Sequence, residues 1–448
     1  MRKNVLLLFF YLLLSVSFLA CSSDTGDISS EAPEYQEEPV DDPEESGTIE
    51  DEFTPLGNVE FLNPDLVEDH YILVNDAAAN RAYLMDKEAR LKYEWELSNN
   101  IGNDVFLLPN GNILASLESD DPQIRFGGKG GRLQIIAPDN SVLWDFIYSS
   151  EAAETHHDAE FLPNGNIIAL VWERKLEEEA LEAGFMLNSN IYPEAVIEVN
   201  PSTNEIIWEW HAWDHLIQDH DPAKSNYGVV SQHPELIDLN YIPKNGGWPQ
   251  AQGDLMHANA IAYDEINDVI FISVNFYSEV WVIDHSTTNE EASGHVGGAY
   301  GKGGDLVYRF GNPGTYENTN GNRLFYNQHY PNPQVGTDQG KLLIFSNGND
   351  ISQSTVYELQ LPENFELLPG SDNEPRILWS YSDSELYSEK VSGAVKLPNG
   401  NILITEGDHG FWEVTRDREV VWKFKSEGFF WRGYSYSKEA PEIKALGL

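Results

Sequence analysis

Between residues 253 and 285 apolar and polar positions alternate in short runs, in the sequence GDLMHANAIAYDEINDVIFISVNFYSEVWVIDH. His257 stands just before the first apolar run, and the polar segment DEIND separates that run from VIFISVNF and EVWVID. Alternation of this kind, interrupted by Asp and Asn, predicts strands joined by tight turns. The stretch therefore predicts three consecutive strands, the first of which begins at a histidine.

The same order of strands and turns recurs along the chain and is marked by two repeated sequence patterns. LPNGN occurs at 108–112, 162–166 and 397–401, each time before an apolar run, and Asn-Gly favours a hairpin because both residues tolerate positive φ. Aromatic and polar residues close six units, at 93–95, 143–146, 207–210, 307–310, 378–381 and 421–424. Repeats of several strands, about 40 to 50 residues long, are typical of propellers. The pattern predicts an all-β protein, a six-bladed β-propeller over residues 54–436, with a C-terminal tail over 437–448.

Two segments interrupt the repeats. Residues 174–184, RKLEEEALEAG, have the pattern of a short amphipathic helix, and residues 211–252 form a long connection rich in aromatic residues. Loops of this length on a compact scaffold commonly form functional walls or lids. We therefore expect a propeller with a short inserted helix and a long inserted loop at the mouth of its site.

The N-terminus has the pattern of a bacterial lipoprotein. Arg2 and Lys3 precede an apolar run at 5–14, which is too short for a membrane span, and the sequence SFLAC ends at Cys21. We expect residues 1–20 to be a signal peptide, Cys21 to carry lipid, and the acidic, Pro-rich residues 21–53 to be a tether. An ordinary signal peptide with a free Cys21 is the alternative. The expected location is the bacterial cell envelope, with the anchor in the outer membrane and the domain facing the periplasm or the cell surface.

Charge and cysteine content exclude several classes of protein. The net charge of −47 argues against nucleic acid as a partner, because phosphates would be repelled. A single cysteine excludes a disulfide framework within the chain and a zinc site made of cysteines. The composition leaves the oligomeric state open, including a homo-oligomer.

Histidines recur where the inner strands should begin. The first strand of each blade lines the central channel of a propeller, so its starting residues form a ring at one end. The position six residues before the proline of LPNGN is His157 in one unit, and Asn103 and Ser392 in the others. His257 and His329 stand at the corresponding place in two units without LPNGN. We therefore expect His157, His257 and His329 to converge. The ends of the second strands return to the same rim, which adds His409, Arg174 and Asn349.

A cluster of histidines on a channel rim suits group transfer. A neutral imidazole can attack an electrophile while a second imidazole protonates the leaving group. Nearby cations can stabilise an anionic group during its transfer. Structural histidines and a bound transition metal are the alternatives, although HExxH spacing is missing. The segments GKGG at 128–131 and 301–304 lack the pattern of a phosphate-binding loop, and GxSxG is absent. We expect no cofactor and no metal ligand.

Several segments together resemble the bacterial arylsulfate sulfotransferase family over residues 55–436. The resemblance is carried, in order, by THHDAEFLPNGNIIALVWE, GDLMHANAIAYDEINDVIFISVNFYSEVWVIDH, KGGDLVYRFGNP, NQHYPNP with GKLLIFSNGN, and SGAVKLPNGNILITEGDHGFWEVTRDREVVWKF. It implies a six-bladed propeller that moves a sulfuryl group from a phenolic sulfate ester to a phenolic acceptor. The family uses a sulfated histidine and no nucleotide donor.

The resemblance also implies roles for individual residues. His257 in MHAN and His329 in NQH match family histidines, and we expect His409 in EGDHG to be the nucleophile, with His157 assisting. The family arginine has no counterpart, because residues 345–352 contain no basic residue. The expected substrate-binding residues are Arg174, Arg323, Lys302 and Asn349 for the sulfuryl group, and Trp213, Tyr227 and Trp248 for the acceptor phenol.

Two interpretations from other classes of protein remain open. A lipid-anchored propeller that has lost catalysis and binds a ligand or scaffolds an assembly would account for the missing arginine. A propeller that holds a metal or a quinone cofactor is the other, although quinone-dependent propellers usually need eight blades.

Overall fold

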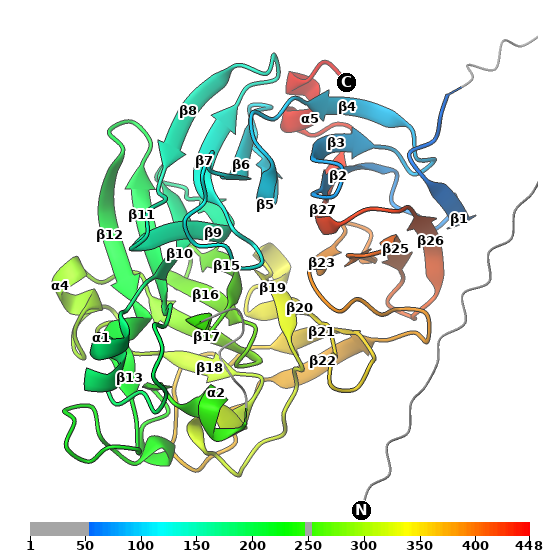
Figure 1. Cartoon of the computed structure of the whole chain (residues 1–448). Coiled ribbons are helices and arrows are strands. Elements are labelled where there is room, and N and C mark those ends of the chain that lie inside the picture. The colour runs from blue at the N-terminus through cyan, green and yellow to red at the C-terminus, as the bar shows by residue number, and fades with distance from the viewer. Residues whose placement is uncertain (1–52, 247–252) are drawn as a thin grey trace, which may run out of the picture. The chain divides into compact units, whose positions relative to one another are not determined.

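The computed structural model describes residues 53–246 and 253–448, and Phe53–Leu448 forms one compact unit. Cys21 and Trp248 therefore lie outside the described residues. Six antiparallel sheets surround a central axis, so the predicted six-bladed β-propeller is confirmed (Figure 1). In the described part of the chain, no helix is both long and apolar enough to cross a bilayer.

Each blade is a sheet of four strands that follow one another from the central channel outwards. Blade 1 contains β27 (Phe430–Ser437), β2 (His70–Asp76), β3 (Arg81–Met85) and β4 (Leu91–Trp95). Blade 2 contains β5 (Ile101–Leu107), β6 (Ile113–Glu118), β7 (Gly131–Ile136) and β8 (Val142–Ile147). Blade 3 contains β9 (Ala153–Phe161), β10 (Ile167–Glu173), β11 (Glu194–Asn200) and β12 (Glu205–His211).

The second half of the ring follows the same order. Blade 4 contains β15 (Ala258–Asp264), β16 (Val269–Val274), β17 (Glu279–Asp284) and β18 (Tyr308–Phe310). Blade 5 contains β19 (Gln328–Pro333), β20 (Lys341–Ser346), β21 (Thr355–Gln360) and β22 (Arg376–Tyr381). Blade 6 contains β23 (Gly393–Lys396), β24 (Ile402–Glu406), β25 (Gly410–Val414) and β26 (Val420–Lys425), with β1 (Asn58–Leu62) paired outside β26.

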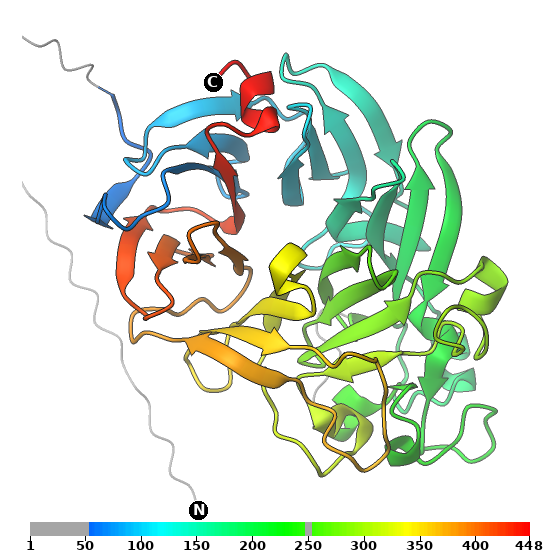
Figure 2. The ribbon, with the colours of Figure 1, turned by 180° about the vertical axis from the view of Figure 1, so that it is seen from behind.

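The two ends of the propeller close the ring. The C-terminal strand β27 is the innermost strand of blade 1, beside the N-terminal strand β2, and β1 pairs with β26 of the last blade (Figure 2). Past β27, the residues predicted as a tail include α5 (Pro441–Ala445), whose Ile443 is fully buried against blades 1 and 2. Both the first and the last blade thus combine strands from the two ends of the chain, which holds the ring closed.

The repeated sequence marks have clear structural counterparts. Each LPNGN forms the turn between the first and second strands of a blade, with the glycine at φ +83, +88 or +89. The six closing sequences lie in the fourth strands β4, β8, β12, β18, β22 and β26. Their tryptophans join neighbouring blades: Trp144 Nε1 donates to Asn204, Trp379 Nε1 to the Arg416 carbonyl, and Trp422 Nε1 to the Lys87 carbonyl.

The insertions form small elements on the propeller. The predicted short helix is α1 (Glu177–Glu182), between β10 and β11. The long connection contains η1 (Ala212–His215), β13 (Leu216–Ile217), η2 (Val230–Gln232), β14 (Ile237–Asp238) and α2 (Tyr241–Lys244). Other connections contain α4 (Asn289–Ala292), η3 (Pro313–Tyr316) and η4 (Gly336–Asp338).

Replacing Glu413 with alanine is expected to destabilise the ring closure. Lys87 Nζ lies 2.7 Å from the Glu413 carboxylate, and both side chains are buried between the first and last blades. Burial lowers the pKa of Lys87, and the charge and hydrogen bond of Glu413 oppose this effect. Removing one member of a buried ion pair typically costs about 3 to 5 kcal/mol of unfolding free energy.

Urea unfolding would measure this loss. The matched control is Glu94→Ala, which removes the exposed partner of Arg81 and should cost about 1 kcal/mol or less. Equal effects of the two substitutions would contradict the assigned role of the Lys87–Glu413 pair.

Candidate active site

A cavity of about 480 Å³ opens at the end of the channel where the inner strands begin. Its walls come from blades 4, 5 and 6 and from the loop between β6 and β7. The residues that line it are Gly127, Asp254, His257, Asn275, Phe276, Asn327, His329, Asn349, Asp350, Glu389 and Lys390.

Three of the predicted histidines meet at this end of the channel. The rings of His157 and His257 lie nearly perpendicular, with their centroids 4.8 Å apart. Trp431 of β27 contacts both His157 and His329, at centroid distances of 5.5 Å and 5.8 Å. Residues from blades 3, 4 and 5 are thus joined by the strand that closes the ring.

Irregular backbone turns two of these histidines toward the channel. His157 and His257 both have φ near +53, and the pairings of β9 with β10 and of β15 with β16 shift register beside them. A left-handed conformation at a non-glycine residue costs about 1 to 3 kcal/mol and is concentrated at functional sites. The bulges re-aim side chains that a regular strand would direct elsewhere.

A glycine loop packs directly on His157. The His157 amide donates to the Gly128 carbonyl at 2.9 Å, and a Cβ on Gly128 would lie 2.0 Å from the His157 ring. Only glycine fits at this position, since Gly128 also has φ +79. The segment GKGG at 128–131, which lacks the pattern of a phosphate-binding loop, is therefore a wall of the histidine cluster.

His257 is paired with a carboxylate. Its Nδ1 lies 2.5 Å from Asp254 Oδ2, and Phe276 stacks on the ring at 4.6 Å. Burial lowers the pKa of His257, but the attraction of Asp254 and the hydrogen bond to it outweigh burial and raise the pKa above 6.5. His257 can therefore present a proton to the cavity near neutral pH.

The tautomer of His329 is fixed by Asn347. The Asn347 amide group donates to the carbonyls of Ser388 and Val391, so its oxygen faces His329 Nδ1 at 2.7 Å. That oxygen can only accept, so Nδ1 carries the proton and Nε2 carries a lone pair. The Val391 amide donates to Nε2 at 3.2 Å, so this lone pair accepts a hydrogen bond in the resting site. Burial lowers the pKa of His329 to about 3 despite the hydrogen bond to Asn347, which keeps the ring neutral.

His157 is the end of a buried chain of three titratable groups. Glu194 Oε2 lies 2.8 Å from His156 Nε2, and His156 Nδ1 lies 2.8 Å from His157 Nδ1. Trp172 stacks on His156 at 3.8 Å. Burial raises the pKa of Glu194 well above 4.5 and lowers the pKa of both histidines well below 6.5. With all three groups neutral, Glu194 donates to His156, His156 donates to His157, and His157 holds its remaining proton on Nε2.

Cations stand at the mouth of the cavity. Lys390 is exposed there, two residues before Ser392, and Arg323 lies 3.7 Å from the carboxylate of the lining residue Asp350. Asn349 lines the cavity as well. Segment 345–352, which lacks a basic residue, thus supplies Asn347 and Asn349 instead.

Other predicted site residues lie away from the cluster. His409 is exposed in the turn between β24 and β25, and no side-chain hydrogen bond or ring contact joins it to the three histidines in the described part of the chain. Arg174 pairs with Glu151 at 3.4 Å after β10. Lys302 lies in the loop between β17 and β18, which packs on β12 through Gly304. Trp213 lines a different cavity, together with Tyr227.

Sequence reasoning missed several residues of the site. Asp254 stands three residues before His257, and His156 precedes His157 directly, so local spacing could have indicated both. Lys390 could have been found two residues before the aligned position Ser392. Glu194 and Asn347 gave no local signal, because they reach the histidines only through the fold.

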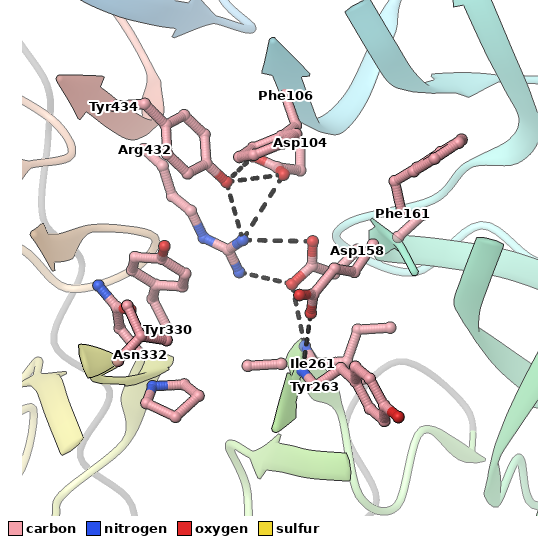
Figure 3. Close-up of a pocket in the computed structure, with 15 residues that line it drawn as sticks. Asp104, Phe106, Asp158, Phe161, Ile261, Tyr263, Tyr330, Asn332, Arg432 and Tyr434 are labelled. Carbon is pink, nitrogen blue, oxygen red and sulfur yellow. Dashed lines mark hydrogen bonds and ion pairs between the residues drawn. The ribbon is translucent and has the colours of Figure 1, made fainter. Parts of the chain in front are cut away.

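The opposite end of the channel holds a separate cavity of about 210 Å³ (Figure 3). Arg432 of β27 donates to both oxygens of Asp158, and Tyr434 donates to Asp104, which lies 3.6 Å from Arg432 (Figure 3). Arg432 also lies over the Tyr330 ring at 4.1 Å. These contacts tie the closing strand to β9 and β5, and they occupy the guanidinium away from the histidines.

Comparison with solved structures finds distant similarities. They include the periplasmic gluconolactonase PpgL of Pseudomonas aeruginosa (10% identity, 83% of this chain and 99% of that chain, TM-score 0.43). They also include the Cps50 (Swd1) β-propeller domain of Myceliophteria thermophila (9% identity, 86% of this chain and 97% of that chain covered, TM-score 0.40). A putative 6-phosphogluconolactonase of Bacteroides fragilis has 11% identity, 82% and 83% coverage, and a TM-score of 0.39. Likenesses this distant indicate no activity.

Comparison with curated protein sequences finds no significant match. The model of the arylsulfotransferase (ASST) family matches residues 63–429, which include His157, His257 and His329. The match extends from the segment before blade 1 to the segment before β27. The chain therefore belongs to the arylsulfotransferase (ASST) family.

Proposed function

We propose that this protein is an arylsulfate sulfotransferase that moves a sulfuryl group from a phenolic sulfate ester to a phenolic acceptor without a nucleotide donor. Membership of the arylsulfotransferase family supports the reaction class. The observation that carries the proposal is that one cavity contains a neutral His329 with its lone pair on Nε2 and a His257 held protonated by Asp254. A nucleophile and a proton donor are what the first half of such a transfer needs.

In the first half-reaction His329 Nε2 gives up its hydrogen bond from the Val391 amide and attacks sulfur, and the bond from sulfur to the phenolic oxygen breaks. The departing oxygen takes the proton of His257, so a neutral phenol leaves and His257 becomes neutral. Asn347 accepts the remaining N–H of His329 throughout and stabilises the positive charge that develops on the ring. In the second half-reaction the acceptor phenol gives its proton to His257, its oxygen attacks sulfur, and His329 is released.

The sulfuryl oxygens need donors while the group is transferred. His157 holds a proton on Nε2 beside His257 when Glu194 and His156 are neutral. The exposed ammonium of Lys390 at the mouth attracts the anionic ester. Lys390 takes the place of the family arginine that this chain lacks, His157 packs beside His257 behind the cavity wall, and Arg323 stands beside Asp350 at the rim.

A transfer assay tests the proposal. The purified protein is mixed with p-nitrophenyl sulfate, and nitrophenol release is followed with and without phenol. We expect release that depends on phenol, ping-pong kinetics, and a sulfuryl adduct on the His329 peptide that is labile in acid and stable in alkali. Release without an acceptor would indicate a hydrolase. No release over a panel of aryl sulfates would favour the ligand-binding propeller instead.

The expected setting of this activity is the cell envelope. The lipid anchor at Cys21 lies outside the described residues, so anchoring and location stay predictions from the sequence.

A further inference from the structure

We propose that His215, His295 and Asp305 bind one divalent transition-metal ion, with Zn²⁺ as the best fit, outside the catalytic cavity. His215 ends η1 in the long insertion, and the other two residues lie in the loop between β17 and β18. The two imidazole nitrogens and the carboxylate oxygen all lie within 4.8 Å of one another. Two histidines and a carboxylate form a common ligand set for zinc.

Both histidines direct a nitrogen at the same oxygen. His215 Nδ1 and His295 Nδ1 each lie 2.8 Å from Asp305 Oδ1. His215 Nε2 lies 2.9 Å from the Ala292 carbonyl, which can only accept, so Nε2 carries a proton. In the neutral ring Nδ1 then presents a lone pair to a carboxylate oxygen. Two acceptors in contact need a cation between or beside them, which is either an extra proton or a metal ion.

The surroundings of His215 match those of a metal ligand. Its side chain is fully buried, and metal-bound histidines almost always donate their second N–H to a carboxylate, a backbone carbonyl or water. His215 Nε2 makes such a contact with the Ala292 carbonyl. Trp210 lies parallel to the ring at 5.8 Å and donates to the Gly304 carbonyl. A Cβ on Gly304 would lie 2.5 Å from His215 Nε2, so glycine is required beside the ligand. The ring therefore has one orientation before any ion arrives.

An ion can reach this site from solvent. The His295 side chain is 61% exposed and lines a cavity of about 610 Å³ together with Trp213 and Asp214. Water from this cavity can fill the coordination position that the protein leaves open. A bound ion would connect the long insertion to the loop between β17 and β18. Because the three ligands come from two distant segments, no local spacing motif in the sequence indicates the site. The site is independent of the proposed sulfuryl transfer, since none of its three residues lines the catalytic cavity.

Cobalt binding tests the site directly. The purified full chain is stripped with a chelator and titrated with Co²⁺, whose visible absorption reports coordination by nitrogen and oxygen, and Zn²⁺ is then added as competitor. We expect one equivalent of Co²⁺ to give an absorption band that Zn²⁺ removes. His295→Ala should weaken binding by at least about 100-fold, because it deletes one of three ligands.

The controls separate a site from surface binding and from misfolding. His233→Ala removes another exposed histidine of the same cavity, one that pairs with Glu235, and should bind Co²⁺ like the wild type. Because His295 is exposed, metal-free His295→Ala should melt at the wild-type temperature, and added Zn²⁺ should raise only the wild-type value. Co²⁺ affinity that is equal in the wild type and His295→Ala, or no stoichiometric absorption band in the wild type, would overturn the proposal.

Discussion

Replacing His329 with alanine is expected to lower kcat/KM for sulfuryl transfer by at least about 10⁴-fold and to abolish the covalent adduct. His329 presents the unprotonated nitrogen to the cavity because Asn347 holds the proton of Nδ1. Burial keeps the ring neutral, with a pKa of about 3, so Nε2 stays unprotonated over the whole physiological range, and attack requires it to leave the Val391 amide. Nitrophenol release in the presence of phenol and mass analysis of the His329 peptide measure the two effects.

His409→Ala is the matched control for this substitution. His409 is exposed in the turn between β24 and β25, so its loss should leave both the fold and the transfer rate nearly unchanged. Activity that survives in His329→Ala and disappears in His409→Ala would return the role of nucleophile to His409. The turn would then have to move over the cavity during the reaction.

Substitution of His257 should give the second largest effect. Loss of a positioned general acid typically costs about 10² to 10⁴ in rate, so His257→Gln should lose kcat/KM by that factor. The loss should be greater for phenyl sulfate than for p-nitrophenyl sulfate, because the more basic leaving oxygen depends more on protonation. Initial rates with the two esters measure this difference. Equal losses with both esters would argue against proton donation by His257.

The dependence of transfer on pH follows from the pairing of His257 with Asp254. His257 acts in its protonated form, so kcat/KM should be high at acidic to neutral pH and fall as pH rises through the raised pKa of His257. Asp254→Asn removes the charge that opposes burial, which lowers that pKa and moves the falling limb to lower pH. Lys390→Ala, at the mouth of the cavity, should raise KM and leave the falling limb of the pH profile at its wild-type position. An unmoved limb in Asp254→Asn would contradict the assignment.

The sequence by itself determined the fold. Alternation of apolar and polar residues, the LPNGN turns and the six aromatic closings are local signals, because each acts within one hairpin or one strand. Their order and number specify six repeats, and the structure contains six blades. The family was also recognisable from the order of segments, and the match over residues 63–429 confirms it. The positions of His257 and His329 at the starts of inner strands placed both at one end of the channel.

Counting offsets from the turns could not place every residue of the site. The offset that gives His157 works because the first strand of a blade lines the channel. Residues after second strands start one strand further out, and Asn349 reaches the cavity from there whereas His409 and Arg174 do not. Bulges in β9 and β15 then decide where His157 and His257 point. Such irregularities leave no periodic trace in the sequence.

Only the tertiary structure decided the protonation states on which the chemistry depends. The lone pair of His329 is set by Asn347 and Val391, and the proton of His157 by Glu194, across separations of tens of residues. Burial in the closed ring then shifts the pKa of each group, and burial is a property of the whole assembly. Local sequence can supply a histidine, but its role depends on neighbours that the fold brings from other blades.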